Sequence, residues 1–183
     1  MRPMLPCAAA LASLILIGAA HAEMTLSSDD MTDGGTLADA HVYDGFGCTG
    51  ANLSPSLSWS GAPEGTQSYV VTAYDPDAPT GSGWWHWTVF NIPADTTSLP
   101  KGAGSGEAPL PEGAVQGRTD YATSGFGGAC PPEGDDPHRY IFTVYAMPDE
   151  SLPLDENAPG AMVGFFVNAG ALDSASLTAT YGR

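Results

Sequence analysis

Apolar residues run almost without interruption through two short stretches of the chain. One is "YVVTAY" at positions 69–74, and the other is "RYIFTVYAM" at positions 139–147. Both stretches are rich in β-branched and aromatic residues, which favour strands. A strand with one solvent-facing side alternates apolar and polar residues, so these continuous runs predict central strands covered on both faces.

Three further stretches have strand character, at Leu57–Trp59, His86–Ile92 and Ser176–Tyr181. The 23 glycines and 16 prolines separate these short runs from one another. Such punctuation favours a mainly β body with long loops. The segment Ala94–Gly117 is rich in Gly, Pro and Ser, and we expect it to be a long loop of the functional or mobile kind.

One segment, "NAPGAMVGFFVNAGA" at positions 157–171, has helical spacing. Pro159 suits the first turn of a helix, and Gly170 suits its end. Four residues recur at helical intervals and predict one apolar face packed on the core: Met162, Phe165, Phe166 and Ala169.

The first 22 residues predict a secretory signal peptide. The apolar run Leu11–Ala20 is too short to span a bilayer, and Ala20 and Ala22 offer small residues for cleavage after Ala22. An uncleaved anchor is the alternative, which the short run disfavours. We therefore expect a periplasmic or secreted protein with no transmembrane segment in the mature chain, residues 23–183.

Two cysteines, Cys48 and Cys130, remain after the predicted cleavage. An even pair in an oxidising compartment predicts a disulfide. Two buried free thiols are the alternative.

The chain is strongly acidic, with 21 acidic residues, 5 basic residues and a formal net charge of -16. Phosphate backbones need cationic partners, so we expect no nucleic-acid binding, and anionic membrane surfaces are disfavoured for the same reason. The acidity fits either a saline habitat or solubility through self-repulsion.

The stretch "YDPDAPTGSGWWHWTVFNIP", positions 74–93, carries the first candidate chemistry. Asp75 and Asp77 follow a predicted strand among prolines that restrict the backbone, a pattern also typical of a plain turn. His86 opens the next strand, and strand alternation places its side chain on the face of Thr88 and Phe90. A histidine at a strand end, near carboxylates and tryptophans, favours a pocket.

A second cluster lies in "GFGGACPPEGDDPHRY", positions 125–140. Gly127 and Gly128 can bring backbone N–H groups close to a ligand, although a plain loop explains them too. His138 and Tyr140 share one strand face, and Arg139 points the other way, where we expect a structural ion pair.

The two clusters together resemble the phosphatidylethanolamine-binding protein family, in its bacterial Raf-kinase-inhibitor-like branch. The resemblance implies a β-sandwich with a large central sheet, a smaller second sheet and a C-terminal helix. It also implies a small pocket for phosphoryl groups and other anions. The positions that match the family pocket are Asp75, Asp77, Pro79, Trp84, His86, His138 and Tyr140, with a glycine-rich wall at Gly128, Ala129 and Cys130.

We therefore predict an exported, non-catalytic binding protein for a small anionic or phosphorylated ligand. In this reading Asp75 orients or charges His86, or shares a proton with the ligand. One alternative is inhibition of an extracytoplasmic protease through an exposed loop such as Lys101–Gly117. Another is weak hydrolysis with His86 and Asp75 as an acid–base pair. Neither a nucleophile motif nor a metal motif occurs, and we expect no cofactor.

Overall fold

The computed structural model describes residues 23–183, and the predicted signal peptide lies outside the described residues. All five predicted strands are present, each within a few residues of its expected bounds. The strands are β1 (Thr25–Ser27), β2 (Gly35–Thr36), β3 (Asp44–Gly45), β4 (Cys48–Thr49), β5 (Leu57–Ser60), β6 (Ser68–Asp75), β7 (Trp84–Pro93), β8 (Ser98–Leu99), β9 (Val115–Gln116), β10 (His138–Met147) and β11 (Asp173–Tyr181). The helix α1 spans Gly160–Gly170, and 3₁₀ turns lie at Asp39–His41 and Ala103–Ser105.

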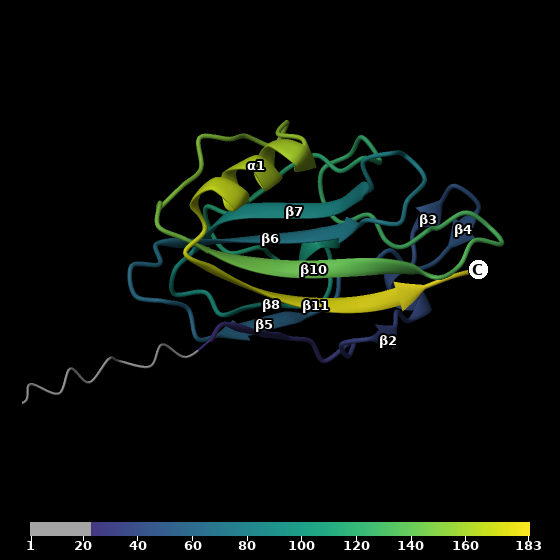
Figure 1. Ribbon diagram of the computed structural model, residues 1–183, viewed down its shortest axis with the longest axis horizontal. Coiled ribbons are helices and arrows are strands. Elements are labelled where there is room, and N and C mark those ends of the chain that lie inside the picture. The colour runs from purple at the N-terminus through teal and green to yellow at the C-terminus, as the bar shows by residue number, and fades with distance from the viewer. Residues whose placement is uncertain (1–22) are drawn as a thin grey trace, which may run out of the picture.

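Within the described residues, the strands form a large sheet of six strands in the order β2-β11-β10-β6-β7-β9 and a small sheet in the order β1-β5-β8. The long strands β7, β6, β10 and β11 lie side by side in Figure 1, and each pairs antiparallel with its neighbour. A short hairpin, β3-β4, lies beyond one end of these long strands. This arrangement is the predicted mainly β fold with a large sheet, a smaller sheet and a C-terminal helix.

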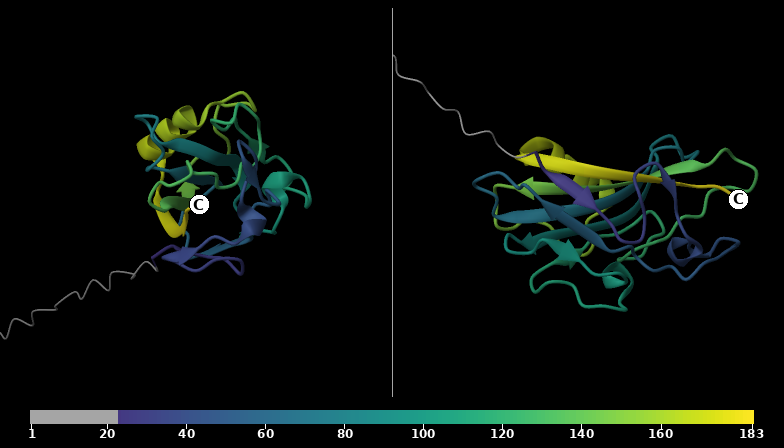
Figure 2. Two further views of the ribbon diagram at one scale, coloured as in Figure 1. Left: turned by 90° about the vertical axis from the view of Figure 1, so that its right-hand side faces the viewer. Right: turned by 90° about the horizontal axis from the view of Figure 1, so that it is seen from below.

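The large sheet is covered on both faces, which explains the continuous apolar runs. Val71 of β6 packs in the main core together with Leu57 of the small sheet. Its neighbour Val70 packs in a second cluster with Val163 and Val167 of α1. Figure 2 shows α1 and the small sheet on opposite sides of the long strands. The two faces of β6 are thus buried against different elements.

The predicted apolar face of the helix is wrong. Met162 and Phe165 are 45% and 65% exposed, Ala169 is exposed and Phe166 is half-buried. The buried face is made instead by Gly160, Val163, Gly164 and Val167. A Cβ atom at Gly160 would overlap the ring of Trp85, so the glycines let the helix approach this tryptophan closely. Pro159 is the N-cap residue, one position before the helix.

The segment Ala94–Gly117 is also more ordered than a plain loop. It contains β8, a 3₁₀ turn and β9, and Leu99 and Ala103 are buried. A Cβ at Gly104 would lie 2.7 Å from Trp87, so this part of the segment packs directly on the core. Within Lys101–Gly117, the loop suggested for contact with a protease, the stretch 106–113 between the 3₁₀ turn and β9 is largely at the surface, whereas the stretch 102–104 is buried.

The predicted disulfide between Cys48 and Cys130 is confirmed, with its two sulfur atoms 2.06 Å apart. It joins the β3-β4 hairpin to the segment that precedes β10. A disulfide fits the oxidising compartment expected of an exported protein. Among residues 23–183, no helix has the length and apolarity needed to cross a membrane.

Candidate ligand-binding site

Three long strands bring the two sequence clusters to the same end of the large sheet. β6 ends at Asp75, β7 begins at Trp84 and β10 begins at His138. Because β6 is antiparallel to both neighbours, its last residue lies beside their first residues. The cavity at this end has a volume of about 180 Å³. Six predicted site residues line it: Asp75, Pro79, Trp84, His86, Cys130 and His138.

His86 reaches the cavity because β7 contains a bulge. Trp87 pairs with Ala73 and Trp85 pairs with Tyr74, so His86 is an extra residue between two consecutive pairs. Trp85 turns toward α1, and His86 turns to the opposite face, where its ring lies 5.0 Å from that of Tyr140. The prediction that His86 shares a face with Thr88 and Phe90 is wrong, because a bulge breaks the alternation and redirects side chains.

The buried imidazole of His86 has a defined tautomer. Its Nδ1 lies 2.7 Å from the carbonyl oxygen of Gly127 and 3.1 Å from that of Gly128. A carbonyl oxygen can only accept, so Nδ1 carries the hydrogen and donates it. Burial lowers the pKa of His86 below its usual value of 6.5. At neutral pH the ring is therefore uncharged, and Nε2 offers a lone pair.

Asp75 orients His138, whereas the sequence interpretation assigned it to His86. Its Oδ2 lies 2.8 Å from Nδ1 of His138, and both side chains are almost completely buried. Its Oδ1 accepts backbone N–H groups of Asp77 and Ala78 at 2.8 and 3.1 Å. These three hydrogen bonds hold the carboxylate in place, so His138 presents Nε2, which lies 3.5 Å from Oδ2 of Asp135 at the surface.

Asp77 lies outside the cavity and forms the ion pair expected for Arg139. Its Oδ1 accepts from Nη2 of Arg139 at 2.6 Å, and its Oδ2 accepts from Nε at 2.9 Å. Arg139 points away from His138, as the strand alternation predicts. The hydrogen bonds from the guanidinium lower the pKa of Asp77 to about 2. Asp77 therefore ties the turn after β6 to β10.

The N–H groups of Gly127, Gly128 and Ala129 are not available to a ligand, contrary to what the sequence suggested for the two glycines. The N–H of Gly127 donates to the carbonyl of His86 at 2.8 Å, and the N–H of Ala129 donates to the carbonyl of His41 at 3.0 Å. The N–H of Gly128 donates to Oδ1 of Asn52 at 2.7 Å. The wall acts through carbonyl oxygens, which fix the His86 tautomer, and Gly128 and Ala129 do not line the cavity.

Tyr140 lies behind His86 and does not line the cavity. It is 2% exposed, and its hydroxyl has no hydrogen-bond partner among residues 23–183. Burial raises its pKa above the usual value, so the phenol stays neutral. Tyr140 supports the His86 ring by edge-to-face packing.

Comparison with known proteins agrees with this fold and with these motifs. The family model for phosphatidylethanolamine-binding protein matches residues 27–182. The chain belongs to the phosphatidylethanolamine-binding protein family. It is 54% identical to YbcL of Escherichia coli over 92% of this chain and 93% of YbcL. It is 55% identical to YbhB of the same organism over 86% of this chain and 99% of YbhB.

Solved structures of the family superpose well on this chain. The crystal structure of E. coli YbcL has a TM-score of 0.86 at 55% sequence identity, and the match covers 88% of this chain and 99% of YbcL. A family homologue from Chlamydia trachomatis has a TM-score of 0.73 at 28% identity, with 88% and 98% of the two chains covered. The two-sheet architecture with a C-terminal helix is therefore the family fold.

Six further residues line the pocket of this family member and were not predicted: Phe46, Ala78, Thr80, Tyr121, Pro131 and Pro132. Tyr121 donates its hydroxyl to the carbonyl of Gly128 at 3.0 Å, and its ring stacks on Tyr43 at 4.0 Å. Its segment is irregular, and hydrogen bonds between Asp120 and Trp85 attach that segment to β7. The tyrosine in "TDYATSGFGG" stands close to the glycine motif, and this proximity is the sequence signal that could have found it.

Proposed function

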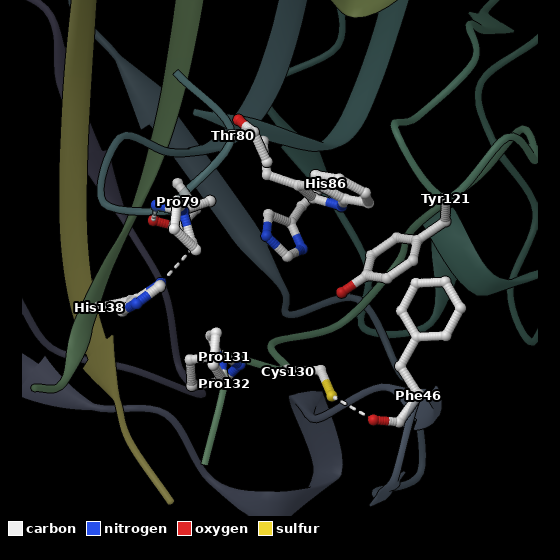
Figure 3. Close-up of a pocket in the computed structure, with 12 residues that line it drawn as sticks. Phe46, Pro79, Thr80, His86, Tyr121, Cys130, Pro131, Pro132 and His138 are labelled. Atoms are coloured by element: carbon white, nitrogen blue, oxygen red, sulfur yellow. Dashed lines mark hydrogen bonds and ion pairs between the residues drawn. The ribbon is translucent and has the colours of Figure 1, made fainter. Parts of the chain in front are cut away.

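We propose that this family member is an exported, non-catalytic binding protein whose cavity holds a small phosphoryl or carboxyl group. The proposal rests on the hydrogen bonds and the position of His86. Its Nδ1 is engaged by two carbonyl oxygens, and its Nε2 has no hydrogen-bond partner among residues 23–183. A buried imidazole with one free nitrogen, set in the wall of a cavity, suits an acid that shares a proton with it. Figure 3 shows His86 near the middle of the cavity, between His138 and Tyr121.

Binding requires one proton, which either stays on the acid or is taken up by His86. No lysine or arginine is among the described residues that line the cavity. A fully ionised acid, with no O–H left, and a neutral Nε2 are both acceptors and cannot bond directly. Either the acid keeps one O–H, or His86 becomes protonated and donates. Both routes need one proton, so binding should strengthen as the pH falls.

The absence of catalysis is part of the proposal, and it is supported by the side chains that line the cavity. The Thr80 hydroxyl donates to the carbonyl of Gly83, and the Tyr121 hydroxyl donates to that of Gly128. Cys130 is bonded to Cys48. Cys130 therefore has no free thiol that could act as a nucleophile. The pair of His86 with Asp75, on which the hydrolase hypothesis depends, is replaced by the pair of His138 with Asp75.

Calorimetric titration with methylphosphonate tests the proposal, because the fully ionised form of this acid has no O–H left to donate to Nε2. We expect a dissociation constant in the millimolar range, which corresponds to about 4 kcal/mol, and tighter binding near pH 5.5 than near pH 8. His86→Ala should weaken binding at least tenfold. Arg139→Ala is the control, because Arg139 pairs with Asp77 outside the cavity.

Both variants are first compared with the wild type by thermal unfolding, and His86→Gln replaces the alanine variant if that variant is unfolded. Binding that does not depend on pH, or a larger loss with Arg139→Ala than with the His86 variant, would show that the acid does not bind at His86. Turnover of phosphoesters that disappears with the His86 variant would replace the binding proposal by an enzymatic one.

A further inference from the structure

One large apolar side chain at the mouth of the cavity is exposed. Phe46, in the turn of the β3-β4 hairpin, is 70% exposed and lines the cavity. The other exposed large apolar side chains among residues 23–183 belong to α1 or to the residues just after it: Met162, Phe165 and Leu172. Figure 3 shows Phe46 next to Tyr121, on the side of the cavity opposite His138. An apolar ring is thus presented to solvent at the entrance of a site lined by histidines.

The hairpin holds Phe46 in this position with several independent contacts. The disulfide attaches the hairpin to Cys130, and Nη1 of Arg183 donates to the carbonyl of Gly47 at 3.0 Å. The Phe46 ring lies 5.4 Å from Tyr121, which lines the same cavity. Phe46 itself has a φ of 52°, a left-handed conformation that is unfavourable for a residue with a bulky side chain. Such conformations persist where the surroundings impose them, and they concentrate at functional sites.

We propose that Phe46 and Tyr121 form an apolar subsite for the substituent of the bound acid. This inference rests on the binding function proposed above. The ligand class is an acid that carries a flat apolar group, with the acid at His86 and the apolar group against Phe46. Two features select this class. The lining residues include no lysine or arginine, so the acid group alone is weakly held, and the rings of Phe46 and Tyr121 offer flat apolar surface.

Two phosphonates test the subsite without the risk of ester hydrolysis. Methylphosphonate and phenylphosphonate share the acid group and differ in the apolar substituent. Burying about 60 Å² of additional apolar surface corresponds to roughly a tenfold gain in affinity. We therefore expect phenylphosphonate to bind about ten times more tightly than methylphosphonate to the oxidised wild-type protein in calorimetric titration near pH 5.5.

Matched phenylalanine variants assign this difference to one ring. Phe46→Ala should reduce the ratio of the two dissociation constants below about threefold, because losing this ring weakens phenylphosphonate more than methylphosphonate. Phe165→Ala is the control, because Phe165 is 65% exposed on α1 and does not line the cavity. This variant should keep the tenfold ratio. Since both rings are exposed, both variants should fold, and thermal unfolding checks this.

The outcomes separate this inference from the function on which it rests. Binding of neither phosphonate would overturn the proposed function. Equal binding of both phosphonates to the wild type would overturn the subsite alone. A ratio that survives Phe46→Ala would also overturn it. A loss of the ratio in Phe165→Ala would show that the apolar group binds elsewhere.

Discussion

Removal of the Cys48–Cys130 disulfide should destabilise the protein strongly. The bridge joins residues separated by 82 positions in the sequence. For a loop of this length, the entropy lost by the unfolded chain corresponds to about 4.5 kcal/mol at 25 °C. For a domain of this size, 1 kcal/mol shifts the melting temperature by roughly 2–4 °C. The double variant Cys48→Ala/Cys130→Ala should therefore melt roughly 9–18 °C below the oxidised wild type.

Urea unfolding followed by tryptophan fluorescence measures the free energy of unfolding of three samples. These are the oxidised wild type, the reduced wild type and the double alanine variant. Alanine is chosen because Cys48 is buried, where the hydroxyl of serine would need a hydrogen-bond partner. We expect both the reduced protein and the variant to lose several kcal/mol, and a reducing agent should leave the variant unchanged.

A loss below about 1 kcal/mol would contradict the loop-entropy argument. It would indicate that the unfolded chain already keeps the two segments close together without the bridge. The same samples test the role of the hairpin in the site. Because the disulfide attaches the hairpin that carries Phe46, its removal should also reduce the preference for phenylphosphonate over methylphosphonate.

Two further predictions concern stability. Gly160→Ala should lower the free energy of unfolding by about 1–3 kcal/mol in urea unfolding, because the new Cβ overlaps Trp85. Gly170→Ala is the control and should be nearly neutral, since its Cβ would meet only Met147 Cε at 3.8 Å. A cost at Gly170 that equals the cost at Gly160 would disprove the packing explanation. Asp77→Asn should destabilise slightly at neutral pH, and the difference from wild type should shrink as the pH falls from about 5 toward 2. The pKa of Asp77 is lowered to about 2 in the folded protein, compared with about 3.9 in the unfolded chain. The ion pair therefore contributes its full stabilisation above about pH 3.9, and this stabilisation is lost as the carboxylate is protonated. A difference that is constant over this pH range would refute the ion-pair account.

The sequence by itself indicated five of the strands (β5, β6, β7, β10 and β11), the approximate position of the helix and the disulfide, and the family resemblance indicated half of the residues that line the cavity. The runs at 69–74 and 139–147 are apolar on both faces because the sheet lies between the small sheet and α1. The pattern could not determine which side of the helix is buried. Its segment is apolar nearly all round, and the choice depends on the space that Gly160 and Gly164 leave for Trp85, a residue distant in sequence.

Only the tertiary structure decided the chemistry of the cavity. Strand alternation predicts one face for His86, and a bulge, set by the register of β7 against β6, places it on the other. Asp75 and His86 are close along the chain, but the pairing of β6 with β10 places the Asp75 carboxylate beside His138. The glycine wall turns its carbonyls toward His86 because its N–H groups are taken by Asn52 and other distant partners. Apart from the bulge between the neighbouring strands β6 and β7, these contacts join segments far apart in the chain, which local patterns of residues do not encode.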